Sequence, residues 1–375
     1  MTYATLPMHR REAFRRPRVL AGALAVLTGA LLLTAPAARA QSNGSPGGVG
    51  TQDPTPSTRD VSKRGLSAAS FLMMPVGARA SAMGGAVVAT TADAASVYWN
   101  PSGLAAVQGG AFQAEYAQWF NTIDFNHAAV AYPLAGGTVA ASVTALRTPE
   151  MEETTLDQQD GTGRTFDAAS YAVGVSYARQ LTDRFAIGGT VKMVSERISV
   201  SNATGFAVDL GTMFVTPLRG IRLGASISNF GTKLQMRGDD LRIGVDVDPN
   251  NSGNGTQNPA QFETGSFDLP LTMRVGLAGE AYRSDQARLT IAVDALSPST
   301  AQQYVNVGAE VGLMNDLVMV RGGYNELFMP GSSHGFTAGG GLRYGFGDLR
   351  LSIDYAFEDS KVFNNVNRVT LAIGF

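Results

Sequence analysis

The sequence predicts an all-β fold, a transmembrane antiparallel β-barrel of about 14 strands with an N-terminal plug in its lumen. Three features predict it: an export signal, alternating apolar and polar residues from about Ala111 to Phe375, and connections that alternate between tight turns and long loops. Alternation indicates strands with two different faces. A soluble β-sandwich would also alternate, so the connection lengths decide in favour of a membrane barrel.

The N-terminus has the order of a secretory signal peptide. Arginines at positions 10, 11, 15, 16 and 18 precede an apolar run from Val19 to Thr34, and Ala38-Arg39-Ala40 predicts cleavage after Ala40. A membrane-anchoring helix is the alternative, since the run is near the shortest length that spans a bilayer. Residues 41–66 are rich in Gly, Ser, Pro and Thr, which predicts a flexible leader.

Composition excludes several classes of function. Cleavage would remove six arginines and one glutamate, which leaves an acidic chain without a basic stripe and argues against nucleic-acid binding. The sequence has no cysteine, so disulfides, thiolate zinc sites and cysteine nucleophiles are impossible. Beyond the signal there is no apolar run long enough for a membrane helix. A closed barrel is the other architecture that satisfies the backbone in lipid.

Residues 111–375 are expected to form the barrel. In Leu349–Phe357 the odd positions are apolar, whereas Arg350, Ser352 and Asp354 lie between them. Tight turns are expected near residues 135, 182, 218, 284, 315 and 346, and longer loops at 148–166, 198–204, 230–267, 295–303, 325–334 and 358–367. An even strand count predicts that both termini return to the periplasm. The terminal Phe375 closes the apolar face of the last strand, as suits the assembly signal of such barrels.

Residues 67–110 carry the most distinctive motif. The segment GARASAMGGA begins at Gly77 and is followed by Asp93 and by SVYWNPSGL from Ser96. This pattern, together with the ending RVTLAIGF, resembles the PorV/PorQ family within the FadL-like group of outer-membrane barrels. The resemblance implies a segment that folds into the lumen as a hatch, or plug, with a structural or gating role. The motif residues are Gly77, Arg79, Met83, Gly84, Gly85, Asp93, Tyr98, Trp99, Asn100, Pro101 and Gly103.

A hatch is physically reasonable because a barrel of this size encloses more space than side chains alone can fill. Glycines and alanines in the segment allow its backbone to pack closely against a wall. We expect the two notable charges, Arg79 and Asp93, to pair with polar side chains of the lumen. The candidates are Arg274, Arg343, Asp294, Asp354 and Glu310.

Two further motifs are weak indications of chemistry. Residues 331–335 (GSSHG) match G-x-S-x-G, but a serine hydrolase needs a strand, a turn and a helix there, and a loop is expected instead. Asp246-Val247-Asp248-Pro249-Asn250 spaces oxygen ligands as calcium loops do, yet Gln257 stands where the bidentate glutamate belongs. We therefore expect no enzymatic activity, no metal site and no cofactor, and leave calcium in loop 246–257 open.

The resemblance implies two alternative functions. PorV-like proteins act in type IX secretion as cargo shuttles or surface-attachment partners, so secretion components and exported cargo proteins would be the partners. FadL-like relatives are channels for long-chain fatty acids or other hydrophobic molecules, which would require an apolar pocket between hatch and wall. Both place the protein in the bacterial outer membrane, in contact with its lipid.

Overall fold

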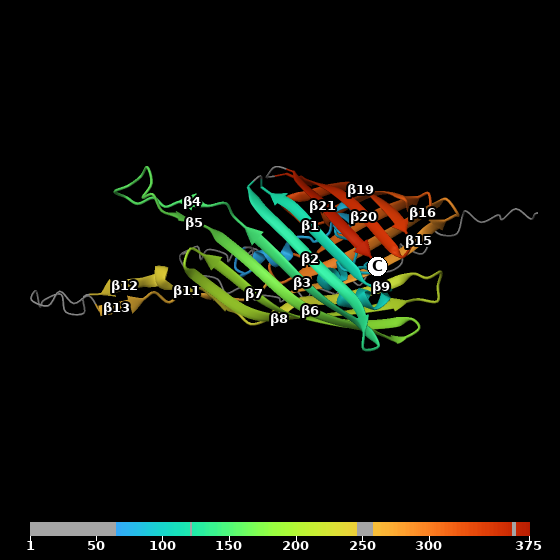
Figure 1. Ribbon diagram of the computed structural model, residues 1–375, viewed down its shortest axis with the longest axis horizontal. Coiled ribbons are helices and arrows are strands. Elements are labelled where there is room, and N and C mark those ends of the chain that lie inside the picture. Colours follow the sequence, from blue (N-terminus) through green and yellow to red (C-terminus); the bar gives the residue numbers. More distant parts are fainter. Residues whose placement is uncertain (1–64, 121, 246–257, 362–364) are drawn as a thin grey trace, which may run out of the picture. The chain divides into compact units, whose positions relative to one another are not determined.

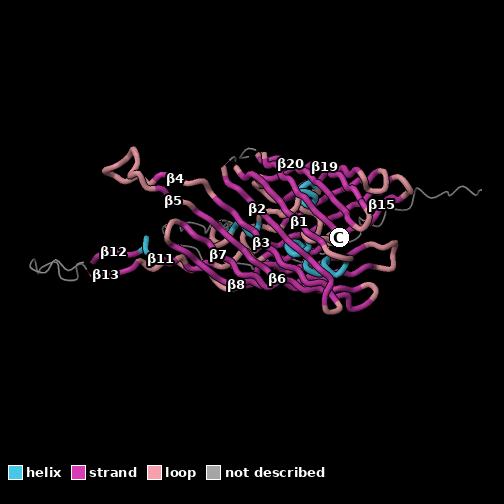
Figure 2. The backbone as a smooth tube through the Cα atoms, viewed as in Figure 1, coloured by secondary structure: helices cyan, strands magenta, loops and turns pink. Residues whose placement is uncertain are grey.

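Fourteen antiparallel strands close into a barrel in the computed structural model, which describes residues 65–120, 122–245, 258–361 and 365–375 (Figures 1 and 2). Each barrel strand pairs with the next one along the chain, and the ring closes where the first strand pairs with the last, Ala111 opposite Gly374. The predicted fold class and strand number are confirmed. The predicted signal peptide, nearly all of the leader, and the calcium candidate at 246–257 lie outside the described residues.

The barrel strands follow the predicted alternation and meet at the predicted tight turns. Their bounds are β1 (Ala111–Trp119), β2 (Ile123–Leu134), β3 (Gly137–Arg147), β6 (Ala168–Thr182), β7 (Phe185–Ile198), β8 (Ser201–Val215), β9 (Arg222–Gly231), β15 (Thr272–Arg283), β16 (Ala287–Pro298), β17 (Tyr304–Leu313), β18 (Val318–Leu327), β19 (His334–Phe346), β20 (Leu349–Ser360) and β21 (Val366–Gly374).

The longer connections form small structures at the other end of the strands. These are β4 (Met151–Glu152) with β5 (Thr165–Phe166), β10 (Leu234–Gln235) with β14 (Ser266–Phe267), β12 (Arg242–Val245) with β13 (Asn258–Gln261), and also β11 (Arg237–Gly238) and the 3-10 helix η3 (Asp239–Leu241). The loop expected at 198–204 is wrong. Only residues 199 and 200 separate β7 from β8, because Ser199 adopts a left-handed φ of 54° that closes a tight hairpin.

The two faces of the wall are opposite in polarity. Outward residues are apolar and exposed, for example Val191 at 59%, Leu210 at 59% and Val275 at 57%. Inward residues such as Thr290 and Arg368 are polar and fully buried. A soluble sandwich would bury its apolar face, whereas an apolar exterior is what lipid requires. The protein is therefore a transmembrane β-barrel.

Within residues 65–110, four short helical elements precede β1: the 3-10 helix η1 (Ser70–Met73), α1 (Ala78–Ala82), α2 (Ser96–Trp99) and the 3-10 helix η2 (Pro101–Ala106). They belong to the segment we call the hatch, residues 67–110. Among the described residues, none of the helices is long and apolar enough to cross a membrane.

Candidate functional site

The hatch fills the lumen, and polar side chains of the wall hold its backbone. Glu115 on β1 accepts a hydrogen bond from the amide of Gly77 at 2.6 Å. Asp294 on β16 accepts one from the amide of Val88 at 2.9 Å. Because the hatch has little regular structure, its amides would otherwise be buried without partners. The polar inner face of the barrel thus replaces the hydrogen bonds that secondary structure would supply.

Glycines of the wall allow the hatch to approach the strands directly. A Cβ atom on Gly188 would lie 2.5 Å from the carbonyl carbon of Pro101, and one on Gly224 would lie 2.5 Å from the carbonyl oxygen of Val88. From the hatch side, a Cβ on Gly84 would lie 2.7 Å from the amide nitrogen of Tyr324. Side chains cannot occupy these positions, so hatch and wall fit as backbone against backbone.

The motif residues Tyr98, Trp99 and Asn100 bind the hatch to itself. The indole nitrogen of Trp99 donates to the carbonyl of Val76 at 2.7 Å, and the Tyr98 hydroxyl donates to that of Leu72 at 3.1 Å. Burial raises the pKa of Tyr98 to about 12, so this hydroxyl stays a donor. These contacts tie two parts of the segment that are more than twenty residues apart in sequence.

Asn100 is fully buried and uses both ends of its amide. Its nitrogen donates to the carbonyls of Val88 at 2.9 Å and Thr212 at 3.0 Å, so it joins the hatch to β8. Its oxygen accepts from the amide and the hydroxyl of Ser102, which caps η2, and Pro101 occupies the first turn, where a missing amide costs nothing. The Asn-Pro-Ser-Gly sequence is thus the start of η2.

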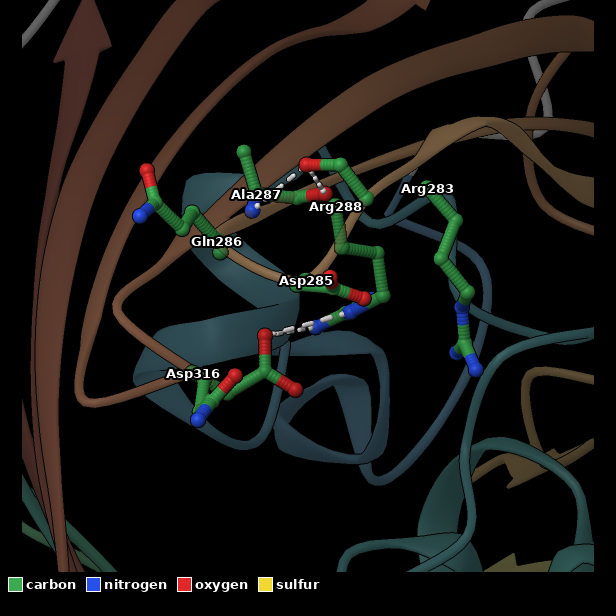
Figure 3. Close-up of a pocket in the computed structure, with 9 residues that line it drawn as sticks. Arg283, Asp285, Gln286, Ala287, Arg288 and Asp316 are labelled. Atoms are coloured by element: carbon green, nitrogen blue, oxygen red, sulfur yellow. Dashed lines mark hydrogen bonds and ion pairs between the residues drawn. The ribbon is translucent and has the colours of Figure 1, made fainter. Parts of the chain in front are cut away.

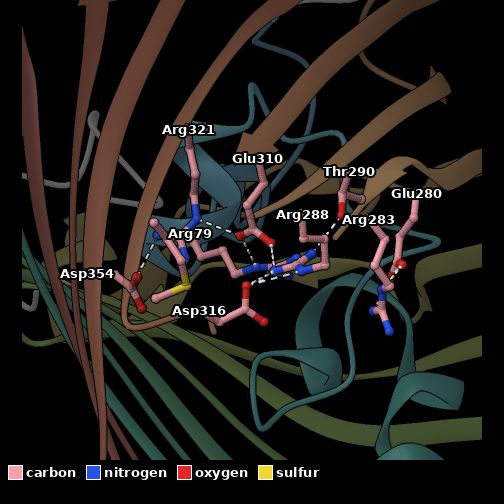
Figure 4. A network of polar contacts seen from close by, with 10 residues as sticks. Arg79, Glu280, Arg283, Arg288, Thr290, Glu310, Asp316, Arg321 and Asp354 are labelled. Carbon is pink, nitrogen blue, oxygen red and sulfur yellow. Dashed lines mark hydrogen bonds and ion pairs between the residues drawn. The ribbon is translucent and has the colours of Figure 1, made fainter. Parts of the chain in front are cut away.

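An ion network joins the hatch to strands of the wall, near the barrel end at which the short turns lie (Figure 4). Glu310 is almost fully buried and receives three guanidinium groups: Arg79 of the hatch at 2.9 Å, Arg321 at 2.7 Å and Arg288 at 3.0 Å. Arg321 also pairs with Asp354, and Arg288 pairs with the more exposed Asp316 at 3.0 Å. Buried charges are tolerated only when paired, and here each carboxylate has an arginine.

A second buried network lies between β1, β20 and β21. Arg368 is fully buried and donates to Glu115 at 2.7 Å and to Glu358 at 3.3 Å. Its guanidinium also lies 5.5 Å from the ring centroid of Phe125. Because Glu115 holds Gly77, this network anchors the hatch as well. Sequence reasoning missed these residues, although three charges on the polar faces of adjacent strands were a usable signal.

The five lumen candidates lie at different places. Glu310 and Asp354 share the network of Arg79, whereas Asp294 binds the hatch backbone instead of a charge. Arg274 donates to Ser228 at 2.9 Å and lies over the rings of Tyr98 and Trp99. Arg343 is exposed at the end with short turns, where it lines an open depression together with Asp93.

Asp93 makes no ion pair among the described residues. It is half-buried and accepts a hydrogen bond from the amide of Ala95 at 3.1 Å. Burial raises the pKa of Asp93, and the Arg79 charge opposes that shift. The Asp93 carboxylate therefore holds the turn that leads into α2, and among the described residues it does not form the expected ion pair with a lumen arginine.

Among the described residues, a cavity opens at the end with short turns, and two others, between hatch and wall, are very small. An open polar pocket of about 460 Å³ lies between the β15–β16 and β17–β18 turns, lined by Arg283, Ser284, Arg288 and Asp316 among others (Figure 3). The two pockets between hatch and wall, around Tyr98, have volumes of about 30 and 40 Å³. Ligand pockets for small molecules usually measure about 300–1,000 Å³, so the inner ones have room for little more than water.

The residues described offer no site with recognisable catalytic chemistry. The G-x-S-x-G segment runs from the β18–β19 loop into the start of β19, so a strand and not a helix follows its serines. Its Ser332 hydroxyl donates to Glu326 at 2.7 Å. No group of three or more His, Asp or Glu side chains in the described ranges could hold a metal ion.

Comparison with known proteins agrees with the geometry. Residues 58–240 match the family model for the type IX secretion system protein PorV. No curated protein matches. Similar solved structures include the toluene transporter TbuX of Ralstonia pickettii, with 15% identity, a TM-score of 0.51 and coverage of 81% of this chain and 98% of TbuX.

Two further structures have the same fold. The toluene transporter TodX of Pseudomonas putida has 13% identity and a TM-score of 0.50, over 80% of this chain and 96% of TodX. A FadL homologue of Pseudomonas aeruginosa has 11% identity and a TM-score of 0.50, over 80% of this chain and 98% of the homologue. At such identities the likeness concerns the fold alone.

Proposed function

We propose that this protein, a PorV-like and FadL-like outer-membrane β-barrel, acts in type IX secretion as a cargo shuttle or surface-attachment partner. The observation that carries the proposal is the closed lumen. Main-chain contacts at Gly84 and Gly224 and the buried ion pair of Arg79 fix the hatch in place. A barrel closed in this way serves other proteins through its ends rather than through a central passage.

The end of the barrel that carries the long loops offers a larger protein-binding surface than the end that carries the short turns. The β4–β5 and β12–β13 hairpins extend the wall at the long-loop end (Figure 1). Exposed apolar side chains at this end include Leu156 between β4 and β5, Phe262 directly after β13, and Phe267 of β14. Exposed apolar groups beyond the membrane belt are typical of protein-interaction sites. Exported cargo and secretion components are the partners that the PorV match supports.

A channel for hydrophobic molecules has less support. It needs an apolar pocket between hatch and wall, and the two cavities around Tyr98 in the described part of the chain have volumes of only about 30 and 40 Å³. We also propose that the protein is not an enzyme, since the G-x-S-x-G serines lie in a strand-to-strand loop.

The test is deletion of the gene in the native host, followed by measurement of surface display of proteins that carry the C-terminal signal domain. Wild-type protein and the Ser333→Ala variant should both restore display, whereas a variant lacking residues 242–261 should restore it poorly while its barrel still folds. Unchanged display after deletion would contradict the secretion role. Tagged protein purified from outer membrane without secretion components or cargo, but with a bound hydrophobic molecule, would favour the channel.

A further inference from the structure

The first and last strands of the barrel meet at a seam that no turn or loop connects. Residues Ala111–Gln118 of β1 pair antiparallel with Asn367–Gly374 of β21, and the two strands lie side by side (Figure 1). Every other pair of neighbouring barrel strands is joined by a turn or a loop, because the strands follow one another in chain order around the ring. The β1–β21 seam is therefore held by non-covalent contacts alone, and its closure has a cost in chain entropy.

Two consecutive amides of the hatch bind the two sides of this seam. The amide of Gly77 donates to the Glu115 carboxylate on β1 at 2.6 Å, and the amide of Ala78 donates to the Thr370 hydroxyl on β21 at 2.8 Å. Glu115 and Thr370 stand directly opposite each other in the register of the seam, and both are buried. The hatch backbone thus bridges β1 and β21 from the side of the lumen.

A buried ion pair crosses the seam at the same place. Arg368 on β21 donates to Glu115 on β1 at 2.7 Å, and both side chains are fully buried. The Glu115 carboxylate uses its other oxygen to accept the Gly77 amide. Without the hatch, water would reach this pair and weaken its attraction, since charges attract less strongly in a medium of high dielectric constant.

Gly77 gives the hatch the backbone conformation that directs both amides towards the seam. Its φ is +90°, which L side chains rarely adopt, and α1 begins at the next residue. Within α1, Ala78 and Ala82 pack against Ala356 of β20, the strand beside β21. The turn that carries the two amides is therefore fixed against the wall next to the seam.

We propose that the hatch is a latch for the β1–β21 seam, so that hatch docking and barrel closure are coupled. With Gly77 and Ala78 in place, the seam gains two buried hydrogen bonds and an ion pair shielded from water. Displacement of this part of the hatch removes these contacts and loosens the one strand pair that no turn or loop connects. Such coupling is reciprocal, so a locked seam must hold the hatch more firmly.

Amide hydrogen exchange, followed by mass spectrometry on the purified protein in lipid nanodiscs, tests the latch. Thr370→Val removes the hydroxyl that Ala78 binds and keeps the size and branching of the side chain. Ser226→Ala is the matched control, because the buried Ser226 hydroxyl on β9 donates to the carbonyl of Trp99 at 2.9 Å, away from the seam. Heat-modifiable migration on gels checks that each barrel has folded.

The latch predicts a local effect of the first variant and none of the control at the seam. Thr370→Val should speed exchange in β1 and β21 by about three- to tenfold, as expected for the loss of one buried hydrogen bond, while β6 and β7 keep the wild-type rate. Ser226→Ala should leave β1 and β21 unchanged. The inference is overturned if Thr370→Val leaves the seam at the wild-type rate, if it speeds exchange equally in all strands, or if Ser226→Ala loosens the seam as much.

A disulfide across the seam gives a second measurement that does not depend on the assembly of Thr370→Val. The chain has no cysteine, and Tyr116 and Val369 stand opposite each other on the exposed face of β1 and β21. Directly opposite residues of antiparallel strands lie within reach of a disulfide. Oxidation of the Tyr116→Cys/Val369→Cys protein therefore locks the seam.

The control disulfide joins two strands that a turn already connects. Val191→Cys/Val208→Cys places the thiols opposite each other on the exposed face of β7 and β8. In a Trp119→Phe background, the fluorescence of Trp99 in the hatch is followed during urea unfolding. Oxidation of the seam pair should raise the urea midpoint of the Trp99 signal by more than oxidation of the control pair does. Equal shifts for the two disulfides, or no shift for the seam pair, would overturn the latch.

Discussion

Replacing Glu310 by glutamine tests whether buried charge pairing holds the hatch in the barrel. Glu310 is 1% exposed, and its carboxylate neutralises Arg79, Arg288 and Arg321 together (Figure 4). The substitution preserves size and polarity but removes the negative charge. Three guanidinium groups then face one another with only Asp354 and Asp316 to compensate them.

The structure predicts a ranking of three variants. Glu310→Gln should lower the free energy of unfolding by about 3–5 kcal/mol, as expected when one member of a buried ion network is lost. Arg79→Met should cost less, about 1.5–3 kcal/mol, because Glu310 keeps two other arginines. Asp316→Asn should cost under about 1 kcal/mol, since this carboxylate is 30% exposed and its interaction is screened by water.

Tryptophan fluorescence during urea unfolding in lipid vesicles measures these differences. The chain has two tryptophans, Trp99 in the hatch and Trp119 on β1. In a Trp119→Phe background, the emission of the buried Trp99 reports the hatch alone. The Arg79→Met protein should lose the hatch signal at lower urea than wild type, ahead of the loss of strand circular dichroism.

The reasoning is refuted if Glu310→Gln unfolds at the wild-type urea midpoint, or if Asp316→Asn is as damaging as Glu310→Gln. Either result would mean that the burial of Glu310 does not determine the strength of the network. Heat-modifiable migration confirms beforehand that each variant forms a barrel, so a failure of assembly is not mistaken for a weak hatch.

Three other outcomes follow from the same structure. Gly84→Ala should destabilise the hatch by about 2–4 kcal/mol, because φ is +63° and the new Cβ meets the Tyr324 backbone. Gly136→Ala is the control, since its φ is also positive, at +73°, but its Cβ would lie in open space. It should cost only about 1–2 kcal/mol in the same urea assay. Burial raises the pKa of Asp93 above 3.8, so the native state holds a proton that the unfolded chain has lost, and stability falls as pH rises from about 4 towards the raised pKa. Asp93→Asn should therefore gain stability relative to wild type over that interval, and a constant difference across pH would contradict the assignment. Val191→Arg, on the lipid face of β7, should cost about 2–4 kcal/mol of stability in vesicles, and a neutral effect would argue against membrane burial of this face.

Strand periodicity was a good guide to the barrel because one physical cause dominates it. Lipid outside and a polar lumen inside force alternation, so Val275 and Leu277 face outward and Gly276 lies between them on the inner face. The loop at 198–204 was wrong because a two-residue hairpin needs only one residue with a left-handed φ, and Ser199 gives no strong sign of it.

The hatch contacts were less accessible to sequence reasoning. Arg79 was recognised as a charge that needs a partner, and Glu310 was among the candidates, but the sequence did not choose among the three carboxylates Asp294, Asp354 and Glu310. Asp93 carried the same signal, yet its carboxylate accepts a local hydrogen bond from the Ala95 amide. A charge in an apolar segment indicates that pairing is needed, whereas the identity of the partner depends on which strand lies opposite.

The sequence by itself determined which face of each strand meets lipid, because that choice depends only on alternate residues along one chain. It also determined that residues 67–110 would be small and closely packed. Only the tertiary structure decided where the hatch begins and ends, which glycines of the wall it touches, and that Arg368 lies between Glu115 and Glu358. Several of those contacts join residues far apart in the sequence, Glu115 and Arg368 among them, and they exist only once the ring of strands closes and brings them together.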